Sequence, residues 1–178
     1  MKRIKYISPV LIILTALIGC KKIESLPDTP FIEFTSFIVF DTTDILGNTY
    51  KGGRLNFYFE DGDGDLGLKQ PSSNYSDTSN LFFKLYKKTA GQFAEVPEDD
   101  FLNPSDYRIP FMDREGQNKI LKGTITVSFL YTFYDVGDTD TVKYEFFVKD
   151  RALNTSNTDT TCEIPLSFNG IYTFEDSL

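Results

Sequence analysis

Apolar and polar side chains alternate one by one along most of this chain, and this period of two constrains its fold more than any other feature. Leu55, Phe57 and Phe59 alternate with polar or aromatic neighbours, and the longest run repeats the pattern from Leu121 to Phe133. Such alternation is typical of half-buried antiparallel strands, which turn one face to the core and the other to solvent. No long segment shows the helical period of about 3.6 residues, so we expect little helix.

The alternating segments predict an all-β fold. We expect strands over residues 31–40, 54–60, 81–88, 93–96, 107–112, 120–134, 142–149 and 160–168, with 93–96 and 107–112 the weakest of them. About seven strands with Gly- and Asn-rich connections indicate an immunoglobulin-like antiparallel two-sheet sandwich. Pro165 has no N–H for a ladder, which predicts that the last strand lies at a sheet edge. Cys162 falls on the apolar face of that strand and is interpreted as a buried core residue.

The N-terminus has the pattern of an export signal. Basic residues at the start, such as Lys2, precede a short apolar run from Val10 to Ile18 that is too short to span a bilayer as a helix. Its end, Leu17-Ile18-Gly19-Cys20, resembles the bacterial lipobox. The resemblance implies that Cys20 is diacylated, with palmitate-type chains, and becomes the first residue of the mature protein. The alternative is an ordinary signal peptide with a chance cysteine.

This interpretation divides the chain into three parts. Residues 1–19 are the lipoprotein signal peptide, residues 20–30 are the lipidated cysteine and a polar tether, and residues 31–178 are a single domain. Because each buried methylene contributes about 0.8 kcal/mol, a multiply acylated Cys20 would hold the protein on a membrane. We therefore expect a cell-envelope protein anchored in the outer membrane. Lys21 and Lys22 carry no sorting signal that identifies the membrane face.

Composition excludes several kinds of function. The chain of 178 residues has no histidine, which removes Ser–His–Asp and Cys–His catalysis and histidine-ligated zinc. Its formal net charge of −8 argues against nucleic acid, whose phosphates require clustered Lys and Arg. We therefore expect a protein that is not an enzyme and does not bind nucleic acid.

A loop rich in aspartate follows the second expected strand. Asp61, Asp63 and Asp65 stand at alternate positions with glycines between them, so that their carboxylates can converge on one cation. A hard divalent ion with oxygen ligands would relieve their mutual repulsion. The match to an EF-hand loop is only partial, because Leu66 takes the place of its glycine and Ser72 that of its final glutamate. Any site here must therefore draw ligands from elsewhere in the chain.

Asp150, at the end of the strand 142–149, is the candidate for this missing ligand. In an immunoglobulin-like strand order, the loop that it begins and the Asp61–Asp65 loop emerge at the same pole of the sandwich. We therefore predict a calcium site made by Asp61, Asp63, Asp65 and Asp150, with a weak affinity of about 10⁻⁴–10⁻³ M, typical of extracellular modules. The alternative is a solvated turn at 61–65, with Asp150 paired to Arg151.

Two segments also carry a family resemblance. LNFYFEDGDGDLGL at 55–68 and FFVKDRALNTSNT at 146–158 resemble parts of uncharacterised Bacteroidota lipoproteins with immunoglobulin-like domains. The second segment is similar to the Asp-x-Ala-Gly-Asn-x-Ser ending of many bacterial immunoglobulin-like repeats, with Leu153 in place of the usual glycine. The resemblance implies a fold and a location but no activity.

Two functions are consistent with these observations. The first is a non-catalytic lipoprotein, a calcium-stabilised interaction or scaffold module of the envelope whose protein partner is unidentified. The second is a glycan-binding accessory lipoprotein of a polysaccharide-uptake system, in which Tyr75, Tyr107 and Tyr134 would stack on sugars. The absence of Trp weakens the glycan hypothesis, and cross-strand packing is the simpler role for exposed aromatic side chains.

Overall fold

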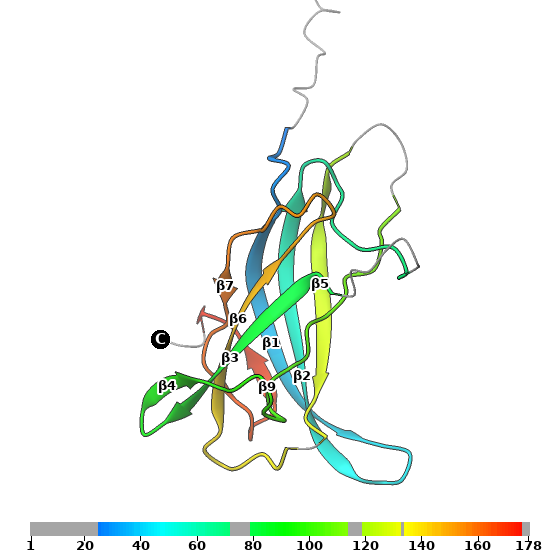
Figure 1. The fold of residues 1–178 in the computed structure, drawn as a ribbon. Helices are drawn as coiled ribbons and strands as arrows, with labels where there is room; N and C mark the ends of the chain where they lie inside the picture. Colours follow the sequence, from blue (N-terminus) through cyan, green and yellow to red (C-terminus); the bar gives the residue numbers. More distant parts are fainter. Residues whose placement is uncertain (1–24, 72–78, 114–118, 133, 176–178) are drawn as a thin grey trace, which may run out of the picture.

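The fold is known from a computed structural model, which describes residues 25–71, 79–113, 119–132 and 134–175. These residues form no α-helix and build two antiparallel sheets that pack face to face as a sandwich (Figure 1). The predicted all-β class and the two-sheet arrangement are therefore confirmed.

The first sheet has the strand order β5-β2-β1-β9. Its members are β1 (Phe31–Thr43), β2 (Thr49–Asp61), β5 (Leu121–Leu130) and β9 (Gly170–Tyr172). The second sheet has the order β4-β3-β6-β7, with β8 also paired to β6. Its members are β3 (Leu81–Thr89), β4 (Gln92–Glu95), β6 (Thr141–Val148), β7 (Asp159–Thr160) and β8 (Ile164–Pro165).

Aromatic side chains from both sheets fill the space between them, as the alternation of the strands requires. The ring of Tyr144 on β6 stacks on Phe37 of β1 and Phe129 of β5, with centroid distances of 5.4 and 5.2 Å. Phe57 of β2 and Phe146 of β6 meet at 5.2 Å. Each such pair adds about 0.5–1.5 kcal/mol to the burial of its apolar surface, so the ring cluster fixes how the sheets stack.

The prediction of a strand at 107–112 is wrong. This segment makes only isolated bridges, Leu81 with Tyr107 and Leu68 with Pro110, and it passes along the side of the sandwich between the two sheets. Pro110 offers no backbone donor, which limits the hydrogen-bond ladder that the segment can form.

The C-terminal strand also differs from its prediction. The expected strand 160–168 is split into β7 and β8. Between them, the Tyr144 N–H donates to the Thr161 side chain at 3.1 Å, while the Thr161 N–H donates to the Tyr144 carbonyl at 2.9 Å. The short β9, which pairs with β1, was not predicted. Two other expectations are confirmed: Cys162 is buried, and Pro165 lies on β8, which among the described strands pairs with β6 alone.

Candidate metal centre

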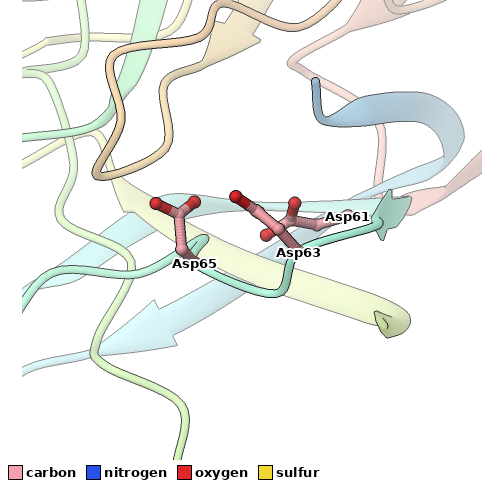
Figure 2. Close-up of side chains that lie close together, drawn as sticks. All are labelled: Asp61, Asp63 and Asp65. Carbon is pink, nitrogen blue, oxygen red and sulfur yellow. The ribbon is translucent and has the colours of Figure 1, made fainter. Parts of the chain in front are cut away.

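The Asp61–Asp65 loop begins directly where β2 ends. Asp61 occupies the last strand position and points inward, while the next residues turn sharply away from the sheet. Gly64 and Gly67 have φ angles of +65° and +100°, a conformation that side chains with a Cβ rarely adopt. The turn brings one carboxylate oxygen each from Asp61, Asp63 and Asp65 within 4.8 Å of one another (Figure 2).

Asp61 is the most unusual of the three carboxylates, because it is completely buried. Its Oδ2 accepts a hydrogen bond from the Leu66 N–H at 2.6 Å, but its Oδ1 is buried without a hydrogen-bond partner. Burial, opposed by the Leu66 bond and reinforced by the charges of Asp63 and Asp65, raises the pKa of Asp61 to about 6. A buried anionic oxygen with no donor is costly, and a cation is the usual remedy.

Asp65 shows the same imbalance to a smaller degree. Its Oδ1 is also buried without a hydrogen-bond partner. Burial raises the pKa of Asp65, and the charges of Asp150 and Asp63 raise it further, while Arg151 and the Ala152 N–H lower it. In the described part of the chain, no Lys or Arg forms an ion pair with Asp61 or Asp65. The carboxylates of Asp61 and Asp65 therefore have no cationic side chain paired directly with them among the described residues.

The predicted meeting of two distant loops is seen in the structure. Arg151 donates from a guanidinium nitrogen to the Gly67 carbonyl at 2.7 Å, and the Ala152 N–H hydrogen-bonds to Asp65. The loop after β6 therefore lies against the aspartate loop at one pole of the sandwich, although 84 residues separate Arg151 from Gly67.

Asp150 itself lies beside the cluster rather than in it. It is buried, and its charge acts on Asp65, but the three-carboxylate cluster does not include it. Both of its oxygens accept hydrogen bonds from Asn154, each at 2.8 Å. Within the described residues Asp150 forms no ion pair with Arg151, and the full burial of Asp61 is at odds with a solvated turn.

The tether also contacts this loop, which the sequence analysis missed. The Gly62 N–H donates to the Pro27 carbonyl at 3.0 Å, and a Cβ at position 62 would overlap the carbonyl oxygens of Leu26 and Pro27. Glycine between two aspartates is a sign of close backbone approach, but sequence spacing does not reveal which segment approaches.

The geometry suits a hard cation with oxygen ligands. Two oxygens that bind one Ca²⁺ at about 2.3–2.6 Å can stand as far apart as about 5 Å, which covers the observed spacing within 4.8 Å. Ca²⁺ takes about 6–8 oxygens, so backbone carbonyls of the loop or water must supply the rest. The negative charge of the three carboxylates favours a divalent ion, and Ca²⁺ accepts a variable number of further oxygen ligands.

The other candidate residues are placed as follows. Cys20 and Tyr75 lie outside the described residues. Tyr107 packs edge-on against Phe83 and Phe129, and its hydroxyl donates to the Ser128 carbonyl at 3.0 Å. The Tyr134 hydroxyl donates to Asp140 at 2.8 Å and accepts from Lys87. Both described tyrosines are half-buried and engaged in contacts within the domain.

Comparison with known proteins identifies no relative, since no family model, curated protein or solved structure matches the chain. Among the described residues, there is no helix with the length and apolar character needed to cross a membrane.

Proposed function

We propose that the chain is a non-catalytic β-sandwich module of the cell envelope that calcium stabilises and that serves in interaction or scaffolding. The observation that carries the calcium part is the fully buried Asp61, whose Oδ1 has no hydrogen-bond partner and stands among two further carboxylates. Folding without a cation leaves this charge uncompensated. A bound Ca²⁺ would convert the repulsion into a cross-link between β2 and the loop that follows it.

An immunoglobulin-type strand order is part of this proposal. The orders β5-β2-β1 and β4-β3-β6-β7 agree with the E-B-A and C′-C-F-G sheets of that fold. In this assignment the aspartate loop connects strands B and C, and the Asp150 loop connects F and G. The contact between these two loops supports the assignment, because both belong to the same end of such a sandwich.

A lipid anchor at Cys20 completes the proposal and rests on the lipobox-like sequence. Gly62 donates to the Pro27 carbonyl, so a tether at residues 20–30 would leave the domain at the aspartate-loop pole. Detergent-phase partitioning of the expressed protein tests the anchor: the wild type should enter the detergent phase, and the C20S variant should not. Equal partitioning of both proteins would rule the anchor out.

The calcium part is tested by thermal melts in millimolar Ca²⁺ and in excess chelator. We expect calcium to raise the melting temperature of the wild type, and D63N to abolish most of this rise. D99N is the matched control, because it removes one negative charge from an exposed loop position remote in sequence from the cluster. A melting temperature that ignores calcium, or a response that survives D63N, would rule out this site.

The glycan-binding alternative has no specific support among the described residues. Tyr107 packs edge-on against Phe83 and donates to the Ser128 carbonyl, and Tyr134 donates to Asp140, so both side chains have a role within the domain. A glycan array with the full chain tests it directly, and specific binding that is lost in Y107A or Y134A would restore this alternative over the first.

A further inference from the structure

Strand β5 presents a long sheet edge that differs from the other edges of the sandwich. On the far side of the same sheet, β1 is covered by β9, and the Asn157 side chain bonds both the N–H and the carbonyl of Ile32 at 2.9 Å. In the other sheet, β4 and the Tyr107 backbone cover β3, and β7 and β8 cover β6. In the part of the chain that the structure describes, β5 pairs with β2 alone.

Two hydrogen bonds show which backbone groups point out from this edge. The Tyr131 N–H donates to the Lys51 carbonyl, so the backbone N–H and C=O groups of the odd-numbered residues from 121 to 131 point toward β2. The Ser128 carbonyl accepts from the Tyr107 hydroxyl, which lies on the other side of the strand. Because N–H and C=O groups alternate in direction along an antiparallel strand, the backbone groups of Thr124 and Thr126 face outward, away from β2.

A pocket of about 450 Å³ opens beside this outward edge. Tyr107, Ile109 and Met112 form one wall, and Ile125 and Val127 on the inner face of β5 form the other. Figure 1 shows β5 at the edge of the first sheet, with the segment 107–113 running beside it. A strand added to β5 would therefore direct every second side chain toward apolar surface, as in recognition by β-augmentation.

Charge distinguishes this groove from the rest of an acidic protein. Among the described residues, its lining holds one charged side chain, Arg108, and no carboxylate, whereas the chain as a whole has a formal net charge of −8. Arg108 is fixed by bonds to the Leu68 carbonyl at 2.6 Å and to Gln70 at 3.0 Å, while its Nε is buried without a hydrogen-bond partner. The groove thus favours an occupant that is apolar and carries an acidic group.

We propose that the β5 edge and its pocket bind an extended peptide segment of a partner protein as an added strand. The peptide pairs with the backbone of Thr124 and Thr126, inserts an apolar side chain between Ile109 and Ile125, and places a carboxylate near Arg108. A second copy of this chain fits less well, because each copy brings its own 107–112 segment to the same edge. This proposal concerns a surface outside the cluster of aspartates, and it stands whether or not that cluster binds calcium.

The test is selection of short peptides from a phage-displayed library on the full chain, followed by affinity measurement with the synthesised winners. We expect an enriched pattern of alternating apolar positions with an acidic residue. T126P should weaken binding by about tenfold or more, because it removes an outward N–H without removing a backbone bond to β2. The bond from the Thr126 hydroxyl to Asn56 on β2, at 2.7 Å, is lost in T126P and in its control alike. T126V keeps that N–H and is the matched control, with affinity expected to remain unchanged.

Two further measurements keep the proposal falsifiable if T126P fails to fold. Methylation of alternate backbone nitrogens in the selected peptide should abolish binding to the wild-type protein for one of the two alternating sets of nitrogens and not for the other. R108Q should lower the affinity for acidic peptides more than the affinity for neutral ones. Absence of enriched peptides, or equal affinity for methylated and unmethylated peptides, would overturn the proposal. A wild-type dimer in sedimentation that T126P dissociates would also overturn it, because the edge would then be an interface between copies.

Discussion

The strongest prediction concerns the sign of the stability change when Asp61 becomes neutral. In the calcium-free protein the pKa of Asp61 is raised from 3.8 to about 6, chiefly by burial. Since each pH unit of pKa difference corresponds to about 1.4 kcal/mol, keeping Asp61 ionised in the folded state near neutral pH costs on the order of 3 kcal/mol. D61N removes this cost.

The net effect of D61N in chelator is smaller than this cost. The Asn side chain can still accept the Leu66 N–H, but the present charge-assisted bond of 2.6 Å becomes a neutral one, which costs about 1 kcal/mol. We therefore expect D61N to be more stable than the wild type by roughly 1–2 kcal/mol in excess chelator. For a domain of this size that raises the melting temperature by about 2–8 °C.

Calcium should reverse this order. At a calcium concentration about 100 times the Kd, the wild type gains about 2.7 kcal/mol, whereas D61N has lost a ligand and gains little. The assay is a pair of melts for each protein, in calcium and in chelator, with D99N as the control that behaves like the wild type in both. Destabilisation of D61N by the same amount in calcium and in chelator would refute the reasoning.

Three further predictions concern pH, the tether and the second sheet. In chelator, the wild type should gain stability as the pH falls from about 7.5 to 4.5, because the folded state binds a proton at Asp61 more tightly than the unfolded state does. This gain is lost as the pH rises through about 6. D61N should lack the gain when it is measured by the same urea titrations. G62A should lower the melting temperature with or without calcium, by about 1–3 kcal/mol in stability, because its Cβ overlaps backbone carbonyls of the tether, and unchanged melts would contradict that contact. D140A should cost about 1–3 kcal/mol in urea titrations, because it removes the carboxylate that lies 2.7 Å from the Lys87 ammonium and leaves Lys87 its weaker bond to the Tyr134 hydroxyl. A loss below that range would mean that water replaces the carboxylate.

The strands were predictable wherever a single local pattern decides them. Alternation located β1, β2, β3, β5 and β6, because in each strand one face lies against the other sheet and the other face does not. At 107–112 the same alternation predicted a strand that does not form. There, the side chains of Tyr107 and Ile109 pack against the core from the side of the sandwich, which accounts for the apolar pattern. Their backbone makes isolated bridges and no continuous ladder of hydrogen bonds.

The candidate site was predictable in part for a similar reason. The spacing of Asp61, Asp63 and Asp65 indicated convergence, and strand counting brought the loop of Asp150 to the same pole. Neither pattern revealed that Asn154, four residues further on, hydrogen-bonds both oxygens of Asp150. Whether Asp150 accepts hydrogen bonds from Asn154 or joins the aspartate cluster depends on the conformation of its loop. The spacing of residues in the sequence does not reveal that conformation.

The metal centre and the groove beside β5 share one segment, so calcium should affect peptide binding. Leu68, three residues after Asp65, bonds to the backbone of Ile109 at 2.9 Å and to the Arg108 side chain at 2.6 Å, and both of those residues line the groove. Calcium that orders the aspartate loop would therefore also restrict the motion of the groove wall that contains Arg108 and Ile109. We expect chelator to weaken the selected peptides by about fivefold, at the lower end of typical couplings between sites. T126P should leave the calcium-induced rise in melting temperature unchanged, because its outward N–H belongs to the opposite wall. Equal peptide affinity in calcium and in chelator would mean that the contacts of Leu68 hold this wall without help from the metal centre.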